Sequence, residues 1–214
     1  MNVQFGMARL LNCDEISNPG KFKFSKTIST GITIEYRIPV SKTVNVEGQG
    51  FTAVTGIGAN LLSYSIDKLL RDSTDIVISA INAGYDYNAL QGFYFDIPLG
   101  ICYITPYNDR HHNFSFELTS RTGFLVCSRS YIKMNIGGEK KEIVEKNTGL
   151  LNRFHTGFNA KVSWNVMYLE PKKNELTGFR FSLWGEYYPT NVFPSGKGVS
   201  AQTSAAGVGI GFNF

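Results

Sequence analysis

The sequence lacks any apolar run long enough to form a spanning helix. Such a helix needs about 20 consecutive, mainly apolar residues, and no stretch of this 214-residue chain approaches that length. The first 30 residues also lack the apolar core of a signal peptide. These absences exclude a membrane protein built from helices, and we expect an exported protein to be represented here by its processed chain, with Met1 added.

Cysteine is scarce and has no metal-binding spacing. Cys13, Cys102 and Cys127 form no CxxC pair, and any pairing of the three leaves one over. The sequence therefore predicts neither a zinc site nor a disulfide framework. Cys102 and Cys127 are both expected to face inward on neighbouring strands, but too far apart along the ladder to form a disulfide.

Strong net charge is also missing. The formal charge is +4, and the basic residues are scattered instead of forming the dense patch that phosphate backbones require. Nucleic acid is therefore not an expected partner. The 22 glycines against 7 prolines suit a sheet with close backbone contacts.

The strongest pattern that is present is a two-residue alternation. In "RFHTGFNAKVSWNVMY", residues 153–168, the even positions are mainly apolar and the odd positions mainly polar. The same alternation recurs in "TISTGITIEYRI" and "GFRFSLWGEY". This period is typical of strands with one apolar and one polar face.

Applied to the whole chain, the alternation predicts eight strands in a single domain, residues 1–214. Their expected ranges are 2–12, 25–38, 43–57, 88–104, 113–131, 151–169, 177–188 and 203–214. The connections after the second, fourth and sixth strands are short and turn-like, and the others are longer. We therefore predict an all-β fold, a closed antiparallel up-and-down transmembrane β-barrel, with short periplasmic turns and long extracellular loops.

Tyrosine followed by proline three residues later marks the ends of three of these strands. The motif occurs as YRIP at 36–39, YITP at 103–106 and YLEP at 168–171. A tyrosine ring suits the membrane interface, and a proline belongs just beyond the paired segment. The predicted aromatic girdle at this end comprises Tyr36, Tyr103, Tyr168, Phe212 and Phe214.

Side-chain volume indicates which face lies inside. A soluble barrel or sandwich would show the same alternation with its apolar face inward, but the interior of an eight-stranded barrel is barely wide enough for its own side chains. The apolar set here is rich in phenylalanine, whereas the polar set is rich in Gly, Ser, Thr and Asn. With the polar face inside, five acidic and five basic residues form the predicted interior charge network: Glu35, Glu47, Asp96, Glu117, Glu186, Arg37, Arg121, Arg153, Lys161 and Arg180.

Three segments depart from the regular pattern. Pro98 falls inside the fourth strand and predicts a bulge there. Residues 58–87 are expected to form a long extracellular loop that builds a cap with a short helix or a hairpin extension. Residues 137–149, "GGEKKEIVEKNTG", are expected to form a mobile outside loop.

The closing segment "AAGVGIGFNF" is the sharpest element of a family resemblance. Through it and the alternation, the chain resembles the small outer-membrane β-barrel proteins of Gram-negative bacteria, most closely the eight-stranded outer membrane protein β-barrel family abundant in Bacteroidota. The resemblance implies an outer-membrane location and recognition of the last strand by the barrel-assembly machinery. It also implies a structural, adhesive or accessory role without one shared activity.

Catalytic and metal-binding readings are weak. His155 with Ser182 or Glu186 suggests a lipid-modifying site at the outer rim, but a complete nucleophile, base and orienting group is not readable. Asp109, His111 and His112 lie in a short turn where adjacent side chains point apart, so we expect no metal site.

We therefore expect a protein that is not an enzyme and carries no cofactor. Its expected partners are outer-membrane lipid, the barrel-assembly machinery and a protein of the cell envelope. The alternatives are a lipid-modifying enzyme and a narrow channel, since alternation alone does not determine whether the interior conducts.

Overall fold

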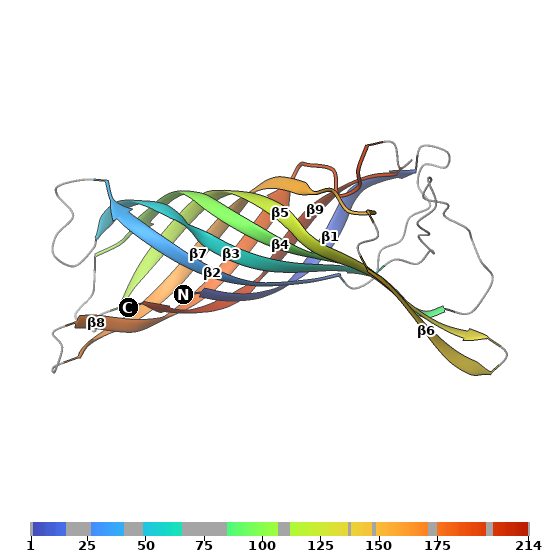
Figure 1. Cartoon of the computed structure of the whole chain (residues 1–214). Helices are drawn as coiled ribbons and strands as arrows, with labels where there is room; N and C mark the ends of the chain where they lie inside the picture. The colour runs from blue at the N-terminus through green and yellow to red at the C-terminus, as the bar shows by residue number, and fades with distance from the viewer. Residues whose placement is uncertain are drawn as a thin grey trace.

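The chain folds into one antiparallel β-sheet closed into a barrel (Figure 1). The computed structural model describes residues 2–15, 27–40, 49–65, 85–106, 112–136, 138–146, 149–170, 175–195 and 199–213. Among these residues, no helix is long and apolar enough to cross a membrane.

Nine strands make up the sheet. They are β1 (Asn2–Glu15), β2 (Thr27–Pro39), β3 (Gly50–Ser65), β4 (Tyr85–Ile104), β5 (His112–Ile136), β6 (Glu139–Lys146), β7 (Phe154–Glu170), β8 (Glu175–Tyr188) and β9 (Val199–Asn213).

Eight of these strands close the ring, and β6 is an addition to it. Each strand of the ring pairs with the next along the chain, β5 pairs with β7, and β9 returns to β1, so the ring has no free edge over the paired segments. The prediction of an eight-stranded, closed, up-and-down barrel is therefore confirmed. We call the end that carries both termini and the β2–β3, β4–β5 and β7–β8 connections the turn end, and the opposite end the loop end (Figure 1).

The alternation in sequence becomes an apolar exterior and a polar interior. Along β7, Phe158 is 56% exposed and Val162 45%, whereas Asn159 and Lys161, one residue away, are 0% and 1% exposed. Phenylalanine, isoleucine and leucine cover the outer surface on all sides of the ring. An exterior of this kind suits lipid, and the closed ladder satisfies the backbone groups that lipid cannot.

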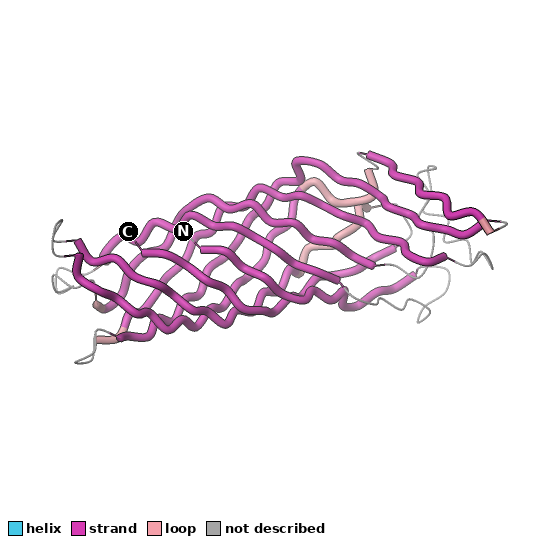
Figure 2. The backbone as a smooth tube through the Cα atoms, turned by 90° about the horizontal axis from the view of Figure 1, so that it is seen from below, coloured by secondary structure: helices cyan, strands magenta, loops and turns pink. Residues whose placement is uncertain are grey.

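The loop end is sealed by an apolar cluster that alternation did not predict. Segments 149–153 and 189–195 fold across the barrel, and Figure 2 shows loop segments lying against the strands at the end away from the termini. We call this cluster the cap; its residues are Leu62, Tyr64, Leu90, Tyr94, Leu150, Leu151, Val192, Phe193 and Ala201, with Leu125 packed against them.

Backbone hydrogen bonds hold the cap segments in place. The Asn152 amide donates to the Val192 carbonyl at 2.7 Å, and the Val192 amide donates to Ala201 at 2.8 Å. The Asn191 side-chain oxygen accepts from the amides of Phe193 and Ala201. The cap therefore combines apolar burial with satisfied backbone groups.

The bulge expected at Pro98 is located elsewhere. At Pro98 the β3–β4 ladder is interrupted between the pairs Thr55/Leu99 and Gly58/Asp96, but its register does not shift. The register shift of β4 against β5 lies nearer the loop end, where Phe93 pairs with Cys127 but Tyr94 pairs with Leu125. Proline here costs ladder hydrogen bonds without adding a residue, so the prediction of a bulge at Pro98 was wrong.

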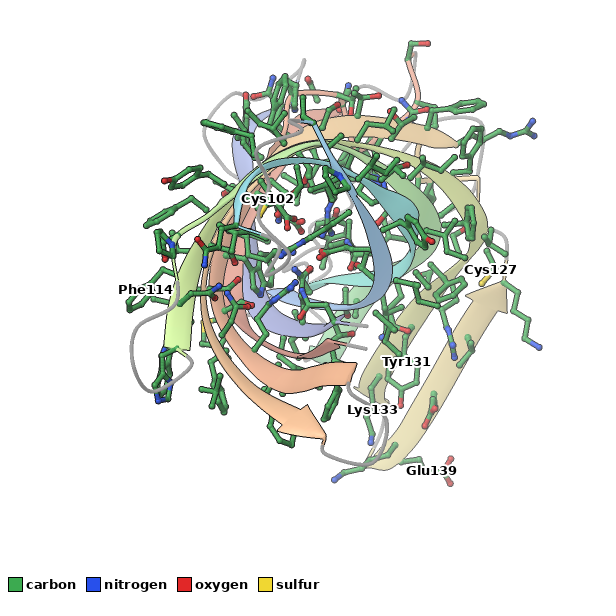
Figure 3. The ribbon with its side chains drawn as sticks, turned by 90° about the vertical axis from the view of Figure 1, so that its left-hand side faces the viewer. Cys102, Phe114, Cys127, Tyr131, Lys133 and Glu139 are labelled. Atoms are coloured by element: carbon green, nitrogen blue, oxygen red, sulfur yellow. The ribbon has the colours of Figure 1, made fainter. Side chains whose placement is uncertain are left out.

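That bulge also reverses the expected orientation of one cysteine. Val126 is the extra residue, so the side chains beyond it change face relative to simple alternation. Cys102 is buried as expected, but Cys127 is exposed on the outside of the wall (Figure 3). The inward placement of Cys127 was therefore wrong, while both described cysteines are free, as predicted.

Two segments expected to be loops contain strand residues. β3 extends to Ser65 and β4 begins at Tyr85, so the ends of the predicted 58–87 loop belong to the barrel wall, and residues 66–84 lie outside the described residues. Within 137–149, Glu139–Lys146 forms β6, which pairs with the end of β5. This hairpin projects past the barrel (Figure 1), because β5 continues well beyond its last pair with β7.

The first prediction tests the bulge by thiol accessibility. In a Cys13→Ser background, a water-soluble maleimide should label the folded protein in detergent at Cys127 within minutes, and Cys102 only after unfolding. The physical reason is that Cys102 is fully buried, whereas Cys127 faces outward. Peptide mass spectrometry reads the sites; a protected Cys127 in the folded protein would contradict the observed register.

Candidate functional site in the barrel interior

The barrel interior holds two clusters of buried charge contributed by β2, β4, β5, β7 and β8. Figure 3 looks along the barrel from the turn end and shows side chains filling the ring. Of the predicted network, the residues that lie inside are Glu35, Arg37, Asp96, Glu117, Arg121, Lys161, Arg180 and Glu186. Among the described residues the network thus balances four carboxylates against four permanent cations.

The cluster nearer the turn end is centred on Lys161. Its ammonium group, whose side chain is 0% exposed, donates to Glu35 and contacts Glu117 at 2.7 Å. Arg37 pairs with Glu117 at 3.0 Å, and Arg180 pairs with Glu35 at 3.3 Å. Each carboxylate therefore lies between two or more cations, an arrangement that offsets the cost of removing these charges from water.

A chain of neutral polar groups extends this cluster. Arg180 Nε donates to the Asn165 side-chain oxygen at 2.9 Å, and the Asn165 amide donates to Asn113 at 2.8 Å and to Ser115 at 3.2 Å. These residues come from β5, β7 and β8, which are adjacent in the ring. Hydrogen bonds of this kind are directional, so they help to fix the register of the three strands.

The second cluster lies nearer the loop end and contains fewer cations. Arg121 pairs with Glu186 at 3.6 Å and donates to Gln4 at 3.2 Å, while the Tyr188 hydroxyl donates to Glu186 at 3.1 Å. Asp96 contacts His155 Nε2 at 2.7 Å. Two carboxylates here face one guanidinium and one imidazole, whereas the turn-end cluster has two carboxylates and three cations.

His155 is fixed tightly by its surroundings. Its ring stacks on Tyr94 with centroids 4.2 Å apart and contacts Tyr188 at 4.4 Å. Gly123 lies opposite His155 in the ladder, and a Cβ there would lie 1.9 Å from His155 Nε2 and 2.2 Å from Asp96 Oδ1. Only glycine leaves space for the Asp96–His155 contact.

Trp184 is a large apolar side chain that the alternation placed on the polar face. It is 5% exposed, its indole donates to the Val208 carbonyl at 3.1 Å, and it packs beside Ala8 and Ala205. A Cβ at Gly6 would lie 2.5 Å from the indole ring. Small residues on β1 and β9 therefore accommodate the bulk of this tryptophan.

Two members of the predicted network are not found in it. Arg153 is exposed, because it precedes β7 in the segment that crosses the loop end, and strand alternation does not apply there. Its backbone carbonyl accepts from the Leu125 amide at 2.8 Å. The interior placement of Arg153 was wrong, and Glu47 lies outside the described residues.

The predicted girdle is partly visible. Tyr36, Tyr103 and Phe212 are 71%, 39% and 38% exposed near the turn end. Tyr168 lies in β7 opposite Thr177, and Phe214 lies outside the described residues. The exposed rings therefore lie on the lipid-facing surface where an interfacial aromatic belt would be.

Of the residues of the enzyme alternative, Glu186 lies in the same cluster as His155, with Tyr188 in contact with both, but Ser182 lies elsewhere. Ser182 shares a hydrogen bond with Ser163 at 3.1 Å, and Ser163 lies eight residues from His155 along β7, about 26 Å in an extended strand. Glu186 is engaged by Arg121 and Tyr188. No hydroxyl nucleophile is hydrogen-bonded to His155 among the contacts of the described residues, and this combination has the geometry of a packing network.

The metal alternative also finds no cluster. Asp109 and His111 lie outside the described residues, and His112 stacks on Trp164 with centroids 5.4 Å apart. The part of the chain that the structure describes contains no group of three or more His, Cys, Asp or Glu residues that could hold a metal ion.

Comparison of the chain with known proteins finds matches among solved structures only. No family profile and no curated protein matches the chain. The solved structures that match include the attachment invasion locus protein Ail of Yersinia pestis, at 9% identity over 99% of this chain and 95% of that chain, with a TM-score of 0.31. Neisserial surface protein A matches at 13% identity over 98% and 94%, with a TM-score of 0.34.

A third solved structure that matches is outer membrane phospholipase A from Escherichia coli. It shows 9% identity over 98% of this chain and 90% of that chain, with a TM-score of 0.24. At these TM-scores, the comparison adds nothing to what the strand pairing itself shows.

The second prediction concerns the central lysine. Lys161→Met should lower the free energy of unfolding by about 3–5 kcal/mol, because it leaves Glu35 and Glu117 buried with less compensating charge. Urea unfolding of the protein refolded into lipid vesicles measures the change. Lys140→Met, on exposed β6, is the matched control and should change stability by less than about 0.5 kcal/mol; equal effects of the two variants would argue against the buried cluster.

Proposed function

We propose that the protein is a non-enzymatic integral barrel of a Gram-negative outer membrane, of the Bacteroidota type. Its plugged interior would make it a rigid anchor, and its extracellular segments would contact a protein of the envelope, as structural element or accessory subunit. The proposal rests on the observation that the barrel is filled: paired charges occupy its interior, and an apolar cap crosses its loop end.

The filled interior argues against transport. Charges that pair with one another are held in place, and an eight-stranded ring leaves little space beside them. The cap adds buried Leu150, Leu151 and Phe193 across the loop end. A barrel built in this way serves best as a scaffold.

The hairpin of β5 and β6 supports a role in contact. It extends beyond the barrel, and β6 is the last strand in the sheet order, so no described strand lies along its outer edge. Its sequence, EKKEIVEK, is highly charged. An exposed edge of this kind can accept a strand from another protein, with the charges limiting nonspecific pairing.

The apolar outer face of the last strand supports the assembly step. β9 closes the ring by pairing with both β1 and β8, and its outward residues Val208, Ile210 and Phe212 are exposed to the lipid side. We propose that this strand is the one the barrel-assembly machinery recognises.

The third prediction tests the plug. The unmodified protein in planar bilayers should show small or no conductance, because the clusters and the cap occupy the lumen. Arg121→Ala removes the guanidinium partner of Glu186 and should produce intermittent leak currents. Lys140→Ala is the exposed control without leak. Large, steady currents from the unmodified protein would instead favour the channel function.

The fourth prediction tests the contact surface. Replacing 135–140 by a two-residue Asn-Gly turn shortens the hairpin and leaves the barrel pairs intact, because β5 pairs with β4 only up to Met134 and with β7 only up to Phe124. Cross-linking in intact cells followed by affinity purification should recover an envelope protein with the full chain and lose it with the shortened one.

Thermal unfolding should be the same for the two forms, which separates loss of contact from loss of fold. Lipid analysis of cells with and without the protein tests whether the protein is an enzyme, which would contradict the proposal. A change in acyl chains that depends on His155 would establish the lipid-modifying enzyme in its place.

A further inference from the structure

The barrel wall has a gap beside β5 near the loop end. β5 pairs with β7 up to Phe124 and Phe154, and it pairs with β6 only from Arg129, opposite Lys146. Between these ladders, the Leu125 amide donates to the Arg153 carbonyl. The bulge at Val126 lies within this stretch.

A groove of about 620 Å³ lies at this gap. Its apolar lining comprises Leu125, Val126, Leu151, Phe154 and Pro194, with Asn152 and Arg153 on its polar side. Leu125 and Leu151 also belong to the cap, while Val126 and Phe154 are 60% and 54% exposed on the outer surface. The groove therefore joins the lipid-facing surface to the apolar cap, and its volume lies within the usual range for ligand sites.

Three cations lie at the groove: Arg153 is part of its lining, and Arg129 and Lys146 lie just beyond the lining residue Ser128. Arg129 and Lys146 are exposed and lie directly opposite each other in the β5–β6 ladder. Like charges in this position repel and destabilise a sheet. Arg153 is exposed on the barrel side, and no ion pair with a described residue joins any of the three side chains.

These two features together define the ligand chemistry. We propose that the groove binds a phospholipid with a net negative headgroup, with one acyl chain against Val126 and Phe154 and the phosphate between Arg153 and the Arg129/Lys146 pair. Arginine binds phosphate through two parallel hydrogen bonds. A bound phosphate would also relieve the repulsion between Arg129 and Lys146.

The distances permit one headgroup to contact both sides. The Leu125 amide is hydrogen-bonded to the Arg153 carbonyl. Leu125 lies four residues from Arg129 along β5, which is about 13 Å in an extended strand. Two extended arginine side chains and a phosphate can bridge this span. A free phosphate ion would use the cations alone, whereas a lipid also uses the apolar floor. This site is distinct from the proposed protein contact, because the groove lining contains no residue of β6, and Lys146 lies at the end of β6 opposite Arg129, away from the hairpin turn.

The fifth prediction uses native mass spectrometry in a zwitterionic detergent. The full chain is titrated with phosphatidylglycerol and with phosphatidylcholine of the same acyl chains. Phosphatidylglycerol should bind more tightly. Arg153→Gln should weaken its binding about fivefold, and Arg129→Gln with Lys146→Gln about 25-fold, since each basic side chain near an anionic lipid headgroup contributes about 1 kcal/mol.

Two further variants separate the groove from general attraction. Val126→Trp fills the groove without changing charge and should weaken both lipids, while Lys133→Gln removes a cation of the same hairpin opposite Glu142 and should leave binding unchanged. Thermal unfolding identifies any variant that fails to fold. If the other variants fail, lipid binding by the exposed Arg153→Gln variant and by the unmodified protein is compared.

Three results would overturn the lipid site. The first is equal binding of the two lipids. The second is a loss with Lys133→Gln as large as that with Arg153→Gln, which would indicate diffuse attraction. The third is displacement of phosphatidylglycerol by millimolar inorganic phosphate with no effect of Val126→Trp, which would indicate an ion site.

Discussion

Pairing of charge inside a narrow ring is the constraint on which the rest of this structure depends. An eight-stranded barrel has an interior just wide enough for side chains, and its exterior faces lipid. Lys161 must therefore find its partners within the ring, and it does so between Glu35 of β2 and Glu117 of β5. A slip of β7 by one residue would expose Lys161 to lipid and turn Val162 inward, so the ion pairs and the apolar exterior enforce the same register.

The two ends of the barrel are filled by different kinds of interaction. Near the turn end, carboxylates, guanidinium groups and amides occupy the space through directional hydrogen bonds. At the loop end, Leu150, Leu151, Val192 and Phe193 close the ring by apolar burial, with Asp96 and His155 beneath them. The loop end is thus rigid at its base, and from this base the β5–β6 hairpin projects. A rigid base with a projecting edge is consistent with a protein that works by contact.

The regular strands could be predicted from sequence because alternation is a local property. The positions of seven strands of the ring follow the alternation, whereas the strand expected at 43–57 is observed as β3 at Gly50–Ser65. The orientation of Glu35, Glu117, Arg121, Lys161 and Arg180 follows from parity once the polar face is placed inside. Parity fails where a residue is inserted or the strand has ended. The bulge at Val126 turned Cys127 outward, and Arg153 precedes β7, so neither obeys the rule. Pro98 disrupts ladder hydrogen bonds without inserting a residue. A proline in a strand can either interrupt the ladder or cause a bulge, and the sequence alone does not distinguish the two.

Side-chain alternation and volume were enough to establish the all-β class, the closed ring and its polar interior, because both depend only on neighbouring residues and on the small radius of the ring. Which charges meet, which segments seal the loop end and where the wall opens depended on contacts between distant parts of the chain. Leu150 and Phe193 become a cap only when two connections cross the same opening. Arg153 lines a groove next to the Arg129/Lys146 pair only because β5 continues beyond its last pair with β7. Such arrangements have no local period, so they arise only from the tertiary fold.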